Sequence, residues 1–279
     1  MFNKFNHLLI NNLEKLRWVN RTISLASLFL IYSLITDQEF SLNWSWNFLG
    51  VTLMIMIGYF FHSLSWSFII SNKISYDKIF SWFLSLIGKY LPFKLGIPIM
   101  RVTKDVQNTE VDTKKYFLGV IYEVLYQVTS GGIIVAMYFI AGFYNIPFLL
   151  LISIFLLILF AIYKTSYSRK PIILFTSFLG YVMFIISIDF LARLAGYEAS
   201  LDIAIAYTAS AIISLFFVGA PAGIGIREYI FITFFNSNEI FATVDFLQIA
   251  LIIRIVYIFT DFFSYSLFKL LEFRDNRKL

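Results

Sequence analysis

Long apolar stretches separated by short polar intervals determine what this chain can fold into. A bilayer's hydrocarbon core requires about 20 mostly apolar residues per helix. Stretches of this kind lie at residues 21–36, 47–71, 116–141, 146–163, 171–195, 201–219, 219–236 and 246–269. Only 14% of the side chains are charged, against about 25% in an average soluble domain. We therefore predict an all-α polytopic membrane protein, one transmembrane domain over residues 1–279 with eight transmembrane segments.

The lysines and arginines indicate the topology, because they collect in the cytoplasmic loops of membrane proteins. With eight crossings, the basic side chains outside the spans fall on the same side as both termini, and the opposite loops contain no lysine or arginine. We therefore expect a protein integral to the cytoplasmic (inner) membrane, with both termini cytoplasmic. This count requires residues 219–236 to cross fully; a re-entrant stretch there would place the C-terminal tail outside.

Near the C-terminus, a helix break and two charges interrupt an apolar run. Pro221, Gly223 and Gly225 precede the adjacent Arg227 and Glu228. Such a break at membrane depth persists only where protein buries it or where it lines a polar cavity. The glycines allow close approach of a ligand, the helix that restarts after them directs free N–H groups into the break, and arginine suits phosphate. We predict that this break binds an anionic headgroup.

Charges within other spans are candidates for the same site. Arg254 and Asp261 are two turns apart on the last span, too far apart to pair directly. Each therefore requires a partner from another helix, because an unpaired charge at bilayer depth is costly. The available partners are Glu123, Arg227 and Glu228. Two roles remain open: these residues line one polar site, or they form structural ion pairs that hold the helices together.

A local ion pair is expected near the outer end of the 171–195 span. Asp189 and Arg193 are four residues apart and therefore share one face of a helix. Arg193 is close enough to the end of the span to extend its guanidinium to the interface. We predict that this pair is structural.

A second interrupted stretch occupies residues 79–100. Its apolar residues precede Pro92 and Gly96, both of which disfavour a continuous helix. The pattern suits either an amphipathic helix on the cytoplasmic face or a re-entrant helix. The secondary candidate site residues here are Lys89, Pro92, Lys94 and Arg101.

The two interrupted stretches resemble each other. In each, a proline lies four residues before a glycine, and an arginine follows shortly after. Many transporters consist of two related halves whose interrupted helices meet at the substrate site. The halves here would be residues 1–141 and 171–279; a chance similarity of two loops is the alternative.

Several chemistries are excluded. The chain has no cysteine, so it has no disulfide and no thiol catalysis. His7 and His62, the two histidines, have no neighbouring partner that would indicate a metal site. No nucleotide-binding loop is present. We expect no metal, no cofactor and no nucleic-acid partner, and we expect a protein that is not an enzyme.

The motif Pro-x-Gly-x-Gly-x-Arg-Glu at residues 221–228 resembles that of the lysylphosphatidylglycerol synthase transmembrane-region family of flippase-like integral membrane proteins. The break at Pro92, the acidic Glu123 and the late Arg254 support this resemblance. The family often has Pro-Gly-Lys where this chain has Pro92-Phe93-Lys94, and the soluble aminoacyltransferase domain of the synthases is missing from this sequence. The resemblance implies translocation of a lipid or a lipid-linked glycan, with a membrane lipid or an isoprenoid-phosphate-linked molecule as substrate.

Two other functions stay open. A non-catalytic accessory or scaffold subunit of envelope lipid or polysaccharide biosynthesis would use its charged spans to bind partner proteins of that machinery. A polyprenyl-phosphate-dependent glycosyltransferase would use Asp37 and Glu39, in the first outer loop, as a catalytic acid pair.

Overall fold

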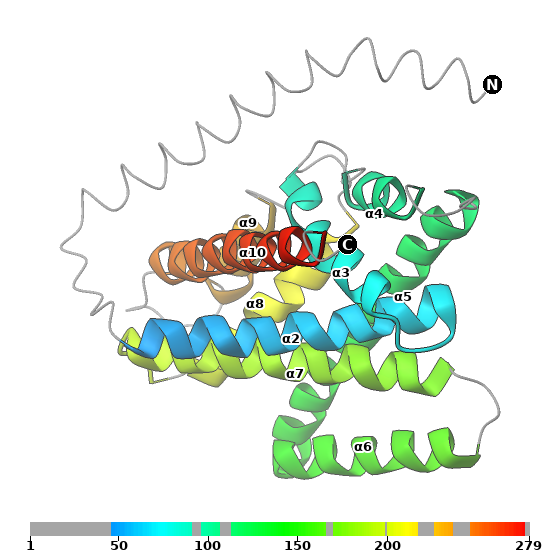
Figure 1. Cartoon of the computed structure of the whole chain (residues 1–279). Helices are drawn as coiled ribbons and strands as arrows, with labels where there is room; N and C mark the ends of the chain where they lie inside the picture. The colour runs from blue at the N-terminus through cyan, green and yellow to red at the C-terminus, as the bar shows by residue number, and fades with distance from the viewer. Residues whose placement is uncertain are drawn as a thin grey trace.

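The described part of the chain is built from helices. A computed structural model describes residues 46–90, 96–106, 113–165, 170–198, 200–216, 226–236 and 246–276. In chain order its elements are α2 (Trp46–Ser71), α3 (Tyr76–Leu84), the 3-10 helix η1 (Leu86–Tyr90), α4 (Gly96–Val106), α5 (Thr113–Tyr144), α6 (Phe148–Thr165), α7 (Lys170–Leu194), α8 (Ser200–Ser214), α9 (Ile226–Asn236) and α10 (Phe246–Asn276) (Figure 1). The predicted all-α class is confirmed for these residues. The predicted span at 21–36 lies outside them.

The membrane character of the chain rests on its longest helices. Within the described residues, four are long and apolar enough to cross a membrane: Asn47–Ser71, Lys114–Tyr144, Lys170–Leu194 and Gln248–Phe273. Each matches a predicted span. Shorter apolar helices at Phe148–Leu159 and Ser200–Ser214 overlap two further predicted spans, 146–163 and 201–219. The chain is therefore a membrane protein by the length and composition of four helices, and the count of eight spans stays a prediction.

The helices α2 and α7 run side by side through the centre of the bundle (Figure 1). A Cβ atom added at Gly58 would lie 3.1 Å from the carbonyl oxygen of Gly180, so the two backbones approach closely there. The hydroxyl of Ser65 lies 2.6 Å from that of Thr176 and 3.0 Å from that of Ser177. Lipid tails are as apolar as leucine, so membrane helices associate through such small residues and polar contacts.

Left-handed residues end three of the helices. Asn72 follows α2 with φ 56°, Asn145 follows α5 with φ 54°, and Gly196 lies just beyond α7 with φ 87°. Asparagine and glycine adopt this conformation at the lowest cost, which explains why they occupy these positions. The turn after α7 is closed by the Tyr197 N–H, which donates to the carbonyl of Ala192 at 3.0 Å.

A hairpin segment, here meaning α3, η1 and α4, packs into the bundle. Its two arms touch, because a Cβ atom at Gly88 would lie 2.5 Å from the backbone of Gly96. The Lys89 ammonium lies 5.5 Å from the centre of the Tyr59 ring and 2.6 Å from Asp261. Both Tyr59 and Asp261 lie near the middle of candidate spans. The hairpin segment therefore reaches half-way along two long apolar helices.

Candidate functional site

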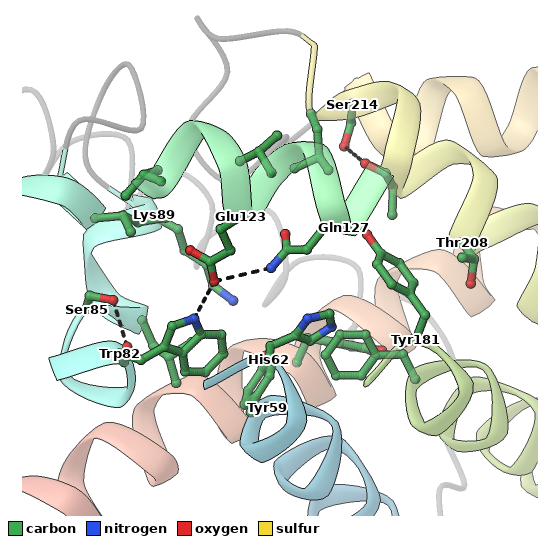
Figure 2. A pocket seen from close by; sticks show the side chains of 18 of the residues that line it. Tyr59, His62, Trp82, Ser85, Lys89, Glu123, Gln127, Tyr181, Thr208 and Ser214 are labelled. Carbon is green, nitrogen blue, oxygen red and sulfur yellow. Dashed lines mark hydrogen bonds between the residues drawn. The ribbon is translucent and has the colours of Figure 1, made fainter. Parts of the chain in front are cut away.

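The elements around the hairpin segment enclose a cavity of about 270 Å³ (Figure 2). Side chains from α2, α5, α7, α8, α9, α10 and the hairpin segment line it. Its charged lining residues are Lys89, Arg101, Glu123 and Arg227. Arg101 follows the break at Pro92 and Arg227 follows the break at Pro221, so the arginines of both interrupted stretches reach the same cavity.

The Glu123 carboxylate on α5 accepts several hydrogen bonds at the cavity. Its side chain accepts hydrogen bonds from Trp82 Nε1 at 2.5 Å, from Gln127 Nε2 at 3.4 Å and from two nitrogens of Arg101 (Figure 2 shows the first two). Arg101 also donates from Nε to Ser85 Oγ at 2.9 Å. Glu123 is 4% and Arg101 3% exposed. Oε1 accepts three of these bonds and Oε2 accepts one, so donors from three other residues hold both oxygens of the carboxylate.

Asp261 on α10 connects the last helix to the hairpin segment. It is fully buried, and it accepts hydrogen bonds from the hydroxyls of Tyr59, at 2.6 Å, and Tyr90. Lys89 forms a salt bridge to the same carboxylate at 2.6 Å. A buried carboxylate requires this number of donors, because removal of a charge from water costs far more than one hydrogen bond returns.

The ion-pair partners differ in part from those expected. Arg254 pairs with Glu228 at 3.5 Å, which is one of the predicted partners. Asp261 pairs with Lys89, so the prediction that its partner is one of Glu123, Arg227 and Glu228 is wrong. Glu123 pairs with Arg101. The reason is the insertion of the hairpin segment between α5 and α10, which brings two cations to carboxylates that would otherwise have faced other spans.

The local pair on α7 is confirmed. Arg193 Nε donates to Asp189 Oδ2 at 3.0 Å, and a hydroxyl from the next helix, Ser200, donates to Asp189 Oδ1 at 2.6 Å. Arg193 is exposed, as expected for a guanidinium near the end of a span. Neither residue lines the cavity.

Arg227 has a different environment from the other cations. Its Cζ lies 5.6 Å from the centre of the Tyr207 ring. Its Nε is buried and has no hydrogen-bond partner of normal geometry among the described residues. Among the residues that the structure describes, the charged side chains in and around the cavity are Lys89, Arg101, Arg227, Arg254, Glu123, Asp261 and Glu228. Each of these carboxylates is bridged to a cation other than Arg227.

Further lining residues were missed by the sequence reasoning. Tyr59, His62, Tyr181, Tyr207 and Tyr257 line the cavity from four helices. Tyrosine and tryptophan normally collect at the two membrane interfaces, whereas Tyr59 and Tyr181 lie near the middle of candidate spans. Polar aromatic residues at mid-span are therefore the sequence signal that would have indicated a cavity.

Five candidate site residues lie outside the described residues: Pro92, Lys94, Pro221, Gly223 and Gly225. In the part of the chain that the structure describes, no group of three or more His, Asp or Glu side chains could hold a metal ion. Comparisons of the chain with protein-family models, with curated proteins and with solved structures find no match, so its resemblance to the flippase-like family rests on its own residues.

Proposed function

We propose that the protein translocates a lipid or a lipid-linked glycan across the membrane and binds the anionic headgroup in the cavity beside Arg227. The observation that carries this proposal is the position of Arg227: it lines a cavity, and the carboxylates that the structure describes around that cavity, Glu123, Asp261 and Glu228, pair with other cations. A guanidinium at membrane depth is costly unless an anion or water accompanies it. A phosphate in the cavity would supply a counter-charge and acceptors for the guanidinium that lines it.

The size and position of the cavity fit a headgroup. About 270 Å³ is close to the lower end, about 300 Å³, of small-molecule pockets. That volume suits a polar headgroup and is too small for acyl or isoprenoid chains, which would stay in the surrounding lipid. Cavity-lining side chains such as Tyr59 and Tyr181 lie near the middle of candidate spans, where a headgroup meets its largest barrier.

The hairpin segment has a defined part in this proposal. We infer that it is re-entrant, because Lys89 reaches the middle of two candidate spans. The two interrupted stretches would then belong to related halves and supply Arg101 and Arg227 to one substrate site, as in transporters with internal repeats.

The test is lipid movement in vesicles that contain only this protein. Purified protein is reconstituted with a fluorescent anionic phospholipid, and dithionite bleaching reports the fraction that changes leaflet. Arg227→Gln is expected to slow translocation about 10- to 100-fold, the equivalent of one lost charged hydrogen bond of about 1.5–3 kcal/mol. Arg193→Gln is the matched control, because that arginine is exposed and lies outside the cavity.

Two results would contradict the proposal. Equal translocation by the wild type and Arg227→Gln would remove Arg227 from the pathway. Vesicles with correctly folded wild-type protein and no translocation would favour the accessory-subunit hypothesis, and co-purification of a stoichiometric partner would then test that alternative.

A further inference from the structure

The hairpin segment brings two cations to the cavity, and their surroundings differ. Arg101 donates to Glu123 and to Ser85. Its Cζ lies 4.0 Å from the centre of the Trp66 ring, and its side chain is 4% exposed. The Lys89 side chain, in η1, is 26% exposed. Of these two cations, Lys89 is therefore the one with surface that a guest in the cavity can reach.

A carboxylate behind the cavity wall holds Lys89 in place. The Lys89 ammonium lies 2.6 Å from Asp261 Oδ2, and the Asp261 side chain is 1% exposed and does not line the cavity. The hydroxyls of Tyr59 and Tyr90 donate to the same carboxylate, which fixes its position. Lys89 does line the cavity, and its side chain extends toward it in Figure 2. An ammonium has three donors, and among the described residues one carboxylate occupies one of them.

Arg227 lines the same cavity from α9. Its positive charge repels the Lys89 ammonium. Two cations, one from each interrupted stretch, thus border one space of about 270 Å³. A phosphate has several acceptor oxygens, so one phosphate between an ammonium and a guanidinium bonds to both and relieves their repulsion.

We propose that Lys89 and Arg227 bind the phosphate of the headgroup together, and that Asp261 competes with this phosphate for the Lys89 ammonium. This inference rests on the proposed function and names a second residue that contacts the substrate. The alternative role of Lys89 is to attach the hairpin segment to α10 through Asp261. The two roles predict opposite effects when the Asp261 carboxylate is removed.

The experiment measures binding of dihexanoyl phosphatidylglycerol, a water-soluble lipid, to the purified full chain by calorimetry. Lys89→Gln removes a charged hydrogen bond to the phosphate and should weaken binding about 10-fold or more. Asp261→Asn removes the competing carboxylate and keeps the ammonium, so binding should tighten about threefold or more. The double variant should bind as weakly as Lys89→Gln. Asp189→Asn with Arg193→Gln is the matched control, because it neutralises a pair outside the cavity and should leave binding unchanged.

A second comparison covers variants that do not fold. Lys89→Gln leaves the buried Asp261 without its counter-charge, whereas the double variant removes both charges. If Lys89→Gln does not fold, the double variant is compared with Asp261→Asn, and if Asp261→Asn does not fold, the double variant is compared with the wild type. Weaker binding by both single variants alike, with the double variant no weaker, would show that Lys89 only attaches the hairpin segment and would overturn the proposal.

Two further outcomes separate this inference from the proposed function. Loss of binding in Arg227→Gln but not in Lys89→Gln would overturn the role of Lys89 and leave headgroup binding at Arg227 intact. Glycerol 3-phosphate distinguishes a lipid headgroup from a free phosphate compound. Lys89-dependent binding of glycerol 3-phosphate by a protein that moves no lipid in vesicles would support the phosphate site and overturn the lipid function.

Discussion

The α2–α7 helix pair and the hairpin segment are held in the same bundle by different interactions. Between α2 and α7, small residues bring the backbones together and neutral hydroxyls bond across the interface. The hairpin segment is instead attached by charge, through Arg101 to Glu123 and through Lys89 to Asp261. The first kind of contact closes the bundle tightly, whereas the second surrounds a cavity, and some of the residues that line it contain buried polar atoms without a hydrogen-bond partner.

This difference separates the scaffold from the site. Close packing of small residues leaves no room for a ligand, and each contact contributes little alone. Buried ion pairs are sensitive, because loss of one partner leaves the other charge uncompensated. We therefore expect single substitutions to cost more in the hairpin segment's ion pairs than between α2 and α7.

The largest effect is expected at Glu123. Glu123→Gln leaves the buried Arg101 without its counter-charge, which should lower the free energy of unfolding by about 3–5 kcal/mol. Thermal unfolding in detergent, followed by tryptophan fluorescence, measures the loss. Glu198→Gln is the matched control, because Glu198 is exposed.

A double variant tests whether the loss of stability comes from the uncompensated charge of Arg101. Glu123→Leu combined with Arg101→Met removes both charges together and should recover much of the stability, as replaced buried pairs often do. If Glu123→Gln is as stable as the wild type, charge does not hold the hairpin segment in place.

A smaller loss is expected at Gly180, in the middle of the α2–α7 contact. A Cβ atom there would lie 2.6 Å from His62 Nε2, so Gly180→Ala requires a shift that should cost about 1–3 kcal/mol. Gly132→Ala on α5 is the control, because its Cβ would have no neighbour within 4 Å. Equal melting temperatures of the two variants would show that α2 and α7 are not closely packed.

The smallest effect is expected at Ser65. Ser65→Ala removes hydroxyl contacts to Thr176 and Ser177, and interhelical hydrogen bonds in membranes contribute about 0.6 kcal/mol on average. The control is Ser153→Ala, whose hydroxyl bonds only to its own helix at the Leu149 carbonyl. A loss at Ser65 as large as that at Glu123 would reject the contrast between the two regions.

Patterns within short stretches of the sequence predicted the features that depend on neighbouring residues alone. Apolar length located the four long helices, and the four-residue spacing predicted the Asp189–Arg193 pair. The partners of Asp261 and Glu123 depend on how deeply the hairpin segment enters the bundle, which no local pattern specifies. Arg227 and Arg101 were candidates because each follows a break, whereas His62 and Tyr207 became visible only when separate helices placed them at one cavity.

The most direct test of headgroup binding is an experimental structure of the protein in nanodiscs that contain phosphatidylglycerol. Our account predicts density for a phosphate within about 3 Å of the Arg227 guanidinium, in the cavity between the hairpin segment and α8. Density for phosphate only at the periphery of the bundle, with the Arg227 side chain bridged to a carboxylate, would contradict it.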